Sequence, residues 1–116
     1  MWRIERTDEV ANWIAGLDDD AKESILKTLF ILREIGPLLG RAYVDTVRES
    51  KHKNMKELRV QCKKRIFRIF FIFDQKQNAV LLIGGNKRGD KNFYKRLIPK
   101  ADRLYDNHLE KKKGIK

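Results

Sequence analysis

Three β-strand patterns follow one another between residues 55 and 84, and this succession constrains the fold more than any other feature. Residues 55–62 alternate apolar and polar side chains, residues 65–73 are the segment richest in β-branched and aromatic residues, and residues 79–84 form a short apolar run. The connections, Lys63-Lys64 and residues 74–78, are short enough for hairpins. The sequence therefore predicts an antiparallel meander in the second half of the chain.

A strand and two helices are predicted ahead of the meander. Residues 2–6 alternate as in a short strand, and Thr7 is a suitable N-cap for the short helix that follows it. Residues 19–35 repeat apolar side chains with a helical period behind the capping residue Asp18, and Gly36-Pro37 ends this helix.

The remaining segments complete an α+β fold. Residues 37–54 have little regular pattern and are predicted to be a loop, whereas residues 90–110 indicate one helix broken at Pro99 or two short helices. We expect an N-terminal strand and two helices packed on a four-stranded, mainly antiparallel sheet, with the helices gathered on one face and a further C-terminal helix. One domain is expected at residues 1–110, and a basic, flexible tail at residues 111–116.

Positive charge is concentrated in the second half of the chain. Residues 1–50 carry 7 Lys and Arg against 10 Asp and Glu, whereas residues 51–116 carry 20 against 6, and the net charge is +11. A polarised charge raises the local concentration of polyanions. Nucleic acid comes first among these, because binding to clustered Lys and Arg releases its counterions. The second half is therefore predicted to bind RNA or another polyanion.

The sequence argues against a disulfide, a metal centre and a membrane span. Cys62 is the only cysteine, so no disulfide can form within the chain, and a lone thiol suits a reducing cytosol. His52 and His108 are the only histidines, too few to build a zinc site around this cysteine. The longest apolar stretch, residues 69–73, is far too short for a bilayer, and the N-terminus has no signal-peptide pattern. We expect a soluble, cytoplasmic protein with no cofactor.

Arg68 is the anomaly of the meander. One face of its strand is wholly apolar, whereas the other face places Arg68 among Ile66, Phe70 and Ile72. A guanidinium between apolar neighbours is costly unless it is paired or meets a ligand. Two interpretations stay open, an ion pair with Glu57 on the adjacent strand or a planar fork that binds phosphate. The apolar neighbours also predict that the C-terminal helix or a partner segment packs nearby.

Two basic segments flank the meander, and a solvated surface is the alternative interpretation of both. Gly84-Gly85 precede the second segment and would let the backbone approach a phosphate, although they match no nucleotide-binding fingerprint. Tyr94 ends that segment with a phenol that can stack on a base or donate a proton, unless it is a half-buried helix residue. The basic residues of the two segments are Lys51, His52, Lys53, Lys56, Lys87, Arg88 and Lys91.

Three motifs follow one another along this half of the chain. They are Glu57-Leu58-Arg59, Phe67-Arg68-Ile69-Phe70-Phe71, and Lys87-Arg88 placed six residues before Tyr94. With the predicted order of elements, they resemble the RelE/ParE superfamily of type II toxins, and most of all its HigB-like, phage-associated branch. The resemblance extends over nearly the whole chain, from about residue 2 to residue 109.

This resemblance implies a ribosome-dependent mRNA endonuclease that is neutralised by a cognate antitoxin, often a helix-turn-helix protein encoded beside it. In RelE-like enzymes the RNA 2′-hydroxyl attacks the adjacent phosphate without a metal. That reaction requires a base, cations on the phosphate oxygens and an acid at the leaving 5′-oxygen. The implied partners are the antitoxin, the ribosome and mRNA, with no membrane.

By position, the resemblance implies that Arg68 binds the scissile phosphate, Arg88 binds a second phosphate or the leaving group, and Tyr94 stacks on the target nucleotide. The general base stays open among Lys51, Lys53, Glu57 and His52, because the late histidine of several relatives has no counterpart near Tyr94. The implied catalytic residues are Lys53, Glu57, Arg68, Arg88 and Tyr94, and the implied RNA-binding residues are Lys51, His52, Lys56, Arg59, Lys87 and Lys91.

Two other functions stay open from the sequence. One is a ParE-like inhibitor of DNA gyrase, although such proteins typically lack the full set of Lys, Arg and Tyr residues present here. The other is a basic module that binds nucleic acid without cutting it.

Overall fold

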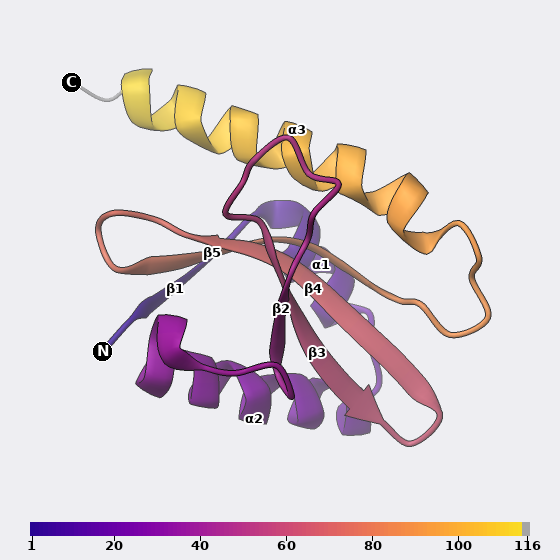
Figure 1. The fold of residues 1–116 in the computed structure, drawn as a ribbon. Helices are drawn as coiled ribbons and strands as arrows, with labels where there is room; N and C mark the ends of the chain where they lie inside the picture. The colour runs from indigo at the N-terminus through magenta and orange to yellow at the C-terminus, as the bar shows by residue number, and fades with distance from the viewer. Residues whose placement is uncertain (115–116) are drawn as a thin grey trace.

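The computed structural model of the protein describes residues 1–114, and the last two residues of the predicted basic tail lie outside this range (Figure 1). Along the chain the elements are β1 (Arg3–Arg6), α1 (Asp8–Ala15), α2 (Asp19–Ile35), the 3-10 helix η1 (Gly36–Leu38), β2 (Val44–Thr46), β3 (Lys56–Cys62), β4 (Arg65–Phe73), β5 (Asn78–Asn86) and α3 (Phe93–Gly114). None of the helices within residues 1–114 combines the length and the apolar character that a membrane span requires.

The sheet has five strands in the order β1-β5-β4-β3-β2. β3, β4 and β5 are antiparallel neighbours, as predicted for the meander, whereas β1 pairs with β5 in parallel and β2 pairs with β3 antiparallel. The predicted count of four strands misses β2, which lies in the segment 37–54 expected to be a loop. β2 is only three residues long, so its pairing with β3 defines it better than any local pattern.

Helices cover both faces of the sheet (Figure 1). α1 and α2 pack on the face that carries Leu58, Ile69 and Phe71. α3 packs on the opposite face, over Phe70 and Ile72. The expectation that the helices gather on one face is therefore wrong for α3. The prediction that the C-terminal helix covers the apolar neighbours of Arg68 is confirmed for Phe70 and Ile72.

α3 is one continuous helix and contains Pro99. Neither predicted alternative, a break at Pro99 or two short helices, is present. Phe93, Leu97 and Ala101 are buried against the sheet on either side of the proline, and this packing offsets the hydrogen bond that proline cannot make. The helix continues to Gly114, past the predicted domain boundary at residue 110.

The predicted helix starts are confirmed, and the end of α2 is tied to the N-terminus. Thr7 Oγ1 and Asp18 Oδ1 each accept a backbone N–H bond from the residue three positions ahead, at 3.1 and 2.9 Å. Gly36 follows α2 with a φ of 66°, in the left-handed region. A Cβ at Gly36 would lie 2.3 Å from Trp2 Nε1, so any larger residue would push the chain ahead of β1 away from α2.

Candidate functional site

A polar cluster lies on the α3 face of the sheet, beside the N-terminal end of α3. Glu57 and Arg59 come from β3, Arg68 from β4 and Tyr94 from the first turn of α3, and we call these four residues the Glu57 cluster. Strand alternation turns Glu57 and Arg59 away from the face of Leu58. Arg59 is paired directly with Arg68 in the β3–β4 ladder. The predicted meander therefore brings these side chains together.

Glu57 is the centre of the cluster, and only 4% of its surface is exposed. Its Oε1 accepts the hydroxyl hydrogen of Tyr94 at 2.8 Å. Its Oε2 accepts hydrogen bonds from Nε and Nη2 of Arg59, both at 3.3 Å. A buried carboxylate requires such partners, because an unpaired charge away from water is costly.

Arg68 is largely buried and only partly satisfied. Its Nε lies 3.7 Å from Glu57 Oε2, so the ion pair expected from the sequence is present, but this distance exceeds that of a hydrogen bond. Its Nη1 donates to the backbone oxygen of Phe67 at 3.0 Å. Nε is buried and has no hydrogen-bond acceptor within residues 1–114. A buried donor without an acceptor carries a free-energy cost, so Arg68 is the incompletely satisfied member of the cluster.

Tyr94 is a proton donor in this setting. Burial first, and then its hydrogen bond to Glu57, raise the pKa of Tyr94, while the nearby Arg68 opposes this shift. The phenol is therefore protonated at neutral pH. Lys87 Nζ lies 5.3 Å from the centre of the ring, which adds a positive charge at the open edge of the cluster.

Gly85 on β5 lets the start of α3 approach the sheet this closely. A Cβ at Gly85 would lie 3.0 Å from Phe93 Cε1 and 3.2 Å from Leu97 Cδ1. A Cβ at Gly84 would lie 2.5 Å from Trp13 Cζ3. Both glycines are therefore needed for the packing of α1 and α3 against β5, which gives them a structural role that requires no phosphate.

Asp45 on β2 completes the surroundings of Arg59, and no sequence pattern singles it out. Its Oδ2 accepts a hydrogen bond from Nη2 of Arg59 at 3.1 Å. The backbone N–H of Thr46 and then the charge of Arg59 lower the pKa of Asp45. Asp45 is recognisable only once β2 is known to pair with β3, which places it opposite Glu57.

A pocket of about 150 Å³ opens beside Glu57 and Tyr94. It gives a ligand access to the otherwise buried carboxylate and to the phenol bonded to it. The remaining lining residues come from β2 and the segment after it and are Thr46, Val47, Arg48 and Glu49.

Residues 47–54 form a strap that passes beside α3 (Figure 1). Lys51 Nζ pairs with Asp106 Oδ2 at 2.5 Å, and His52 Nε2 lies 2.9 Å from Asp106 Oδ1. These interactions raise the pKa of Lys51 and lower that of Asp106. Twelve residues of helix separate Asp106 from Tyr94, roughly 18 Å along the axis. The structure therefore does not bring Lys51 and His52 to the Glu57 cluster.

Two further side chains complete the strap. Ser50 Oγ donates to Asp102 Oδ1 at 2.5 Å, which adds a second link to α3. Lys53 is exposed and lines a groove together with Ile72 and Tyr105. Lys53 thus also lies apart from the four clustered residues.

The remaining predicted residues are divided between the two ends of the meander. Arg88 Nη1 donates to the backbone oxygen of Lys64 at 2.8 Å, at the turn between β3 and β4. Lys56 Nζ donates to Thr46 Oγ1 at 3.0 Å, close to the pocket. Lys91 is exposed in the connection from β5 to α3.

A family model described as phage-derived protein Gp49-like matches residues 12–106 of this chain. The chain belongs to the Gp49-like family.

Two proteins of Mycobacterium tuberculosis (strain ATCC 25618 / H37Rv) are similar to this Gp49-like chain over most of its length. The candidate toxin HigB2 is 41% identical over 104 residues, which are 88% of this chain and 52% of HigB2. The candidate toxin HigB3 is 40% identical over 107 residues, which are 91% of this chain and 92% of HigB3. The chain therefore spans about half of HigB2 and nearly all of HigB3. The HigB-like resemblance predicted from the sequence is confirmed.

Two solved structures share the fold. RelE in the archaeal RelE–RelB complex from Pyrococcus horikoshii OT3 superposes with a TM-score of 0.57 and 16% identity, covering 77% of this chain and 97% of that one. The isolated E. coli RelE toxin gives a TM-score of 0.59 at 10% identity, covering 84% and 96%. The predicted RelE-like α+β fold is confirmed, with one strand more than expected.

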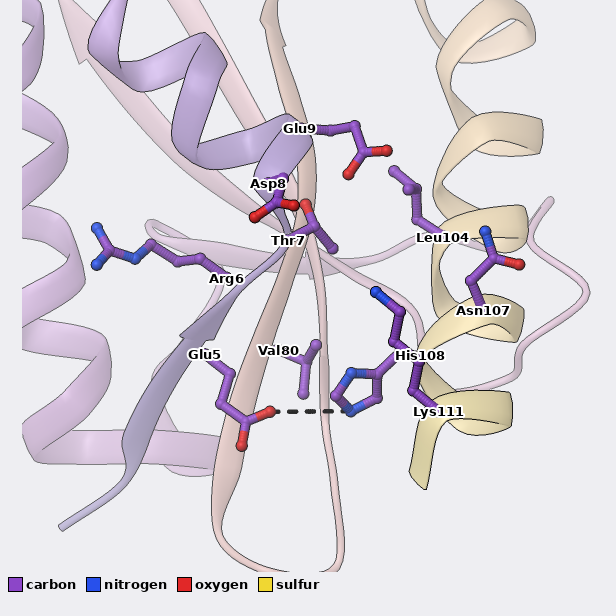
Figure 2. Close-up of a pocket in the computed structure, with 10 residues that line it drawn as sticks. All are labelled: Glu5, Arg6, Thr7, Asp8, Glu9, Val80, Leu104, Asn107, His108 and Lys111. Atoms are coloured by element: carbon purple, nitrogen blue, oxygen red, sulfur yellow. Dashed lines mark ion pairs between the residues drawn. The ribbon is translucent and has the colours of Figure 1, made fainter. Parts of the chain in front are cut away.

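A second pocket of the Gp49-like chain, of about 240 Å³, lies between β1, the start of α1 and α3 (Figure 2). His108 Nε2 is 3.8 Å from Glu5 Oε2 at its edge. Asp8 and Glu9 also line it, and these carboxylates disfavour a phosphate. Within residues 1–114, no group of three or more His, Cys, Asp or Glu is placed to hold a metal ion. The Glu57 cluster is the better candidate for a site that acts on a polyanion.

Proposed function

We propose that this protein is the toxin of a toxin–antitoxin pair and cuts mRNA on the ribosome by a metal-independent reaction. The observation that carries the proposal is the buried Glu57 carboxylate, bonded to Tyr94 and facing an incompletely satisfied Arg68. The names of HigB2 and HigB3 as candidate toxins support it. The same proposal places the protein in the cytoplasm, with an antitoxin of the helix-turn-helix type as its partner.

The cluster offers one group for each requirement of the reaction. The ribose 2′-oxygen attacks the adjacent phosphorus and gives its proton to Glu57, which becomes a carboxylic acid as the 2′,3′-cyclic phosphate forms. The bond from phosphorus to the 5′-oxygen breaks, and Tyr94 can protonate the leaving oxygen because its phenol is neutral. The guanidinium of Arg68 would neutralise the phosphate oxygens where negative charge develops.

The other predicted residues have supporting positions in this proposal. Lys87 above the Tyr94 ring extends the positive charge along the path of the RNA backbone. Arg59 holds Glu57 in place from the side and is itself held by Asp45. Lys53 and Arg88 lie outside the cluster, so their predicted catalytic roles would require RNA to reach them from there, and we expect weaker effects from them than from Arg68.

The proposal is tested by adding the purified protein to a translation mixture that contains a defined mRNA. We expect cleavage products with 5′-hydroxyl and 2′,3′-cyclic phosphate ends, formed equally with or without EDTA, and no cleavage of the same mRNA without ribosomes. Arg103→Ala is a matched control, because Arg103 is an exposed arginine of α3 outside the cluster. An mRNA that stays intact on translating ribosomes would contradict the proposal. Binding without cutting would then favour the non-catalytic module.

A further inference from the structure

An apolar groove of about 290 Å³ lies between α2 and β1, on the face of the sheet opposite the Glu57 cluster. Leu26 and Phe30 of α2 line it and are 62% and 58% exposed. They are one helical turn apart, so they form one apolar ridge. Ile4 of β1 and Leu29 of α2 form the floor. Exposed apolar residues gathered in a groove mark a binding surface more often than single exposed ones do.

β1 borders this groove as an edge strand of the sheet. Arg3 N–H donates to Gln77 O at 2.9 Å and Thr7 N–H to Leu81 O at 3.1 Å, so the odd-numbered residues of β1 face β5. The backbone groups of Ile4 and Arg6 consequently point outward, as strand alternation requires. An edge of this kind is a template for another strand.

Both charged residues that line the groove are arginines, Arg6 and Arg33. The Arg33 guanidinium lies 5.4 Å from the centre of the Phe30 ring. Its Nε is buried, 3.5 Å from Glu34 Oε2, and has no hydrogen-bond acceptor within residues 1–114. On the same outward side, the N–H of Trp2 donates to Arg33 O at 3.0 Å, so the open part of the edge starts at Ile4. The groove thus joins an apolar ridge, this short strand edge and two positive charges, a combination complementary to an extended segment with apolar and acidic side chains.

We propose that the antitoxin adds an extended, acidic and apolar segment to the sheet along β1 and buries it in the α2 groove. This inference rests on the proposed function for the existence of the partner, but not for the location of its binding site. The apolar residues expected from the sequence to attract a partner, Phe70 and Ile72, are covered by α3, and the exposed apolar surface is on α2 instead.

A second copy of this chain fits the edge less well. Each copy carries a net charge of +11, so two copies repel each other. Within the described residues, the groove of each copy also presents two arginines and no acidic residue, so it offers no complementary charge to a second copy.

The test uses the protein encoded by the adjacent open reading frame, with binding to the full chain measured by calorimetry. Phe30→Asp and Arg33→Glu are each expected to raise the dissociation constant about tenfold or more. Leu38→Asp is the matched control, because Leu38 is 89% exposed but does not line the groove. It should bind within about twofold of the wild type. Equal binding by Phe30→Asp and the wild type would overturn the inference.

Amide exchange measured by NMR tests the strand addition itself. The amides of Ile4 and Arg6 should exchange at least about tenfold more slowly in the complex, because a new strand would bond them. If the partner slows amide exchange in α2 but not at Ile4 and Arg6, it docks without adding a strand, and the strand addition is overturned. Concentration-dependent dimers in sedimentation that Phe30→Asp abolishes would instead assign the groove to a second copy.

Ribosome-dependent cleavage by the same variants separates the two proposals. Phe30→Asp should cut mRNA like the wild type, because the groove lies on the other face of the sheet. If the wild type cleaves mRNA and Phe30→Asp binds the partner as tightly as the wild type does, the proposed function is supported and this inference is wrong. An adjacent protein that fails to bind the wild type would overturn this inference, whereas absent cleavage would overturn the proposed function.

Discussion

The Glu57 cluster and the strap both lie beside α3, but they use their positive charges differently. In the strap, Lys51 and His52 meet Asp106 directly, and Lys51 is 60% exposed on its side chain. In the cluster, Arg59 and Arg68 share the single buried carboxylate of Glu57, and Arg68 Nε has no acceptor within residues 1–114. A cation paired at the surface contributes little free energy, whereas a guanidinium held in a largely buried cluster, with an Nε unpaired among the described residues, is the better candidate to meet a phosphate.

This difference distinguishes the arginines of the Glu57 cluster from the basic residues of the strap, which the sequence alone does not distinguish. Both are basic, and both flank or belong to the meander. The burial of Arg68 and its Nε, unpaired within residues 1–114, support our proposal that the cluster is the ligand site. The contacts of Lys51 and His52 with Asp106 indicate that the strap fastens the start of β3 to α3.

The largest expected effect comes from Arg68→Ala compared with Lys51→Ala. Removing Arg68 should reduce ribosome-dependent cleavage by about 100-fold or more, the usual cost of losing a donor to a developing negative charge. Lys51→Ala should stay within about threefold of the wild type, because a rim charge affects mainly encounter. The measurement is the single-turnover rate of mRNA cleavage, with circular dichroism to confirm the fold. Equal losses in the two variants would show that the strap belongs to the active site.

Glu57→Ala should produce the largest change in stability. It leaves Arg68 without its buried counter-charge and Tyr94 without its acceptor, which costs about 3 kcal/mol. Urea unfolding of the variant and of Glu49→Ala makes the comparison, since Glu49 lines the same pocket but is exposed. Glu57→Gln keeps an acceptor for Tyr94 and should lose less. A Glu57→Ala protein as stable as the wild type would mean that the cluster is not held by this carboxylate.

Much of the fold is predictable because its elements have local signals. The predicted ranges 19–35 and 65–73 coincide with α2 and β4, since a long helical period and a dense run of β-formers are each decisive within one element. β2 escapes prediction because three residues carry too little pattern. The covering of Phe70 by α3 also depends on packing between distant segments.

The candidate site is predictable only in part for the same reason. Alternation on adjacent strands brings Glu57 near Arg68 and allows their ion pair to be anticipated. The capture of Lys51 by Asp106 joins residues more than 50 positions apart. Its one sequence signal is the spacing of Asp102 and Asp106, which places two carboxylates on one side of α3.

Tyr94→Phe tests the proton donor and should have a smaller effect on stability than Glu57→Ala. Loss of the hydroxyl bond to Glu57 should cost about 1 kcal/mol at neutral pH. Because the folded protein raises the pKa of Tyr94, this stabilisation is complete below about pH 10 and is lost as the pH rises through the folded-state pKa. The advantage of the wild type over Tyr94→Phe should therefore shrink in urea unfolding above pH 10. Tyr43→Phe is the control, because Tyr43 is an exposed tyrosine outside the cluster. A constant difference between Tyr94→Phe and the wild type across this range would contradict the assignment.

Asp106→Asn probes the strap and should have the smallest effect. The hydrogen bond from Lys51, and then that from His52, lower the pKa of Asp106. Its stabilising contribution is therefore present above the ordinary value of 3.8 and is lost as the pH falls through the lowered folded-state pKa. The thermal midpoint of Asp106→Asn should lie slightly below that of the wild type at pH 7, and the two should converge as the pH falls through the folded-state pKa of Asp106. Glu110→Gln, an exposed carboxylate of the same helix, should show no such difference at pH 7. Cleavage by Asp106→Asn should equal that of the wild type, because Asp106 lies roughly 18 Å along α3 from Tyr94 and the Glu57 cluster. A loss of cleavage as large as that of Arg68→Ala would instead show that the paired cations of the strap are released to the substrate on the ribosome.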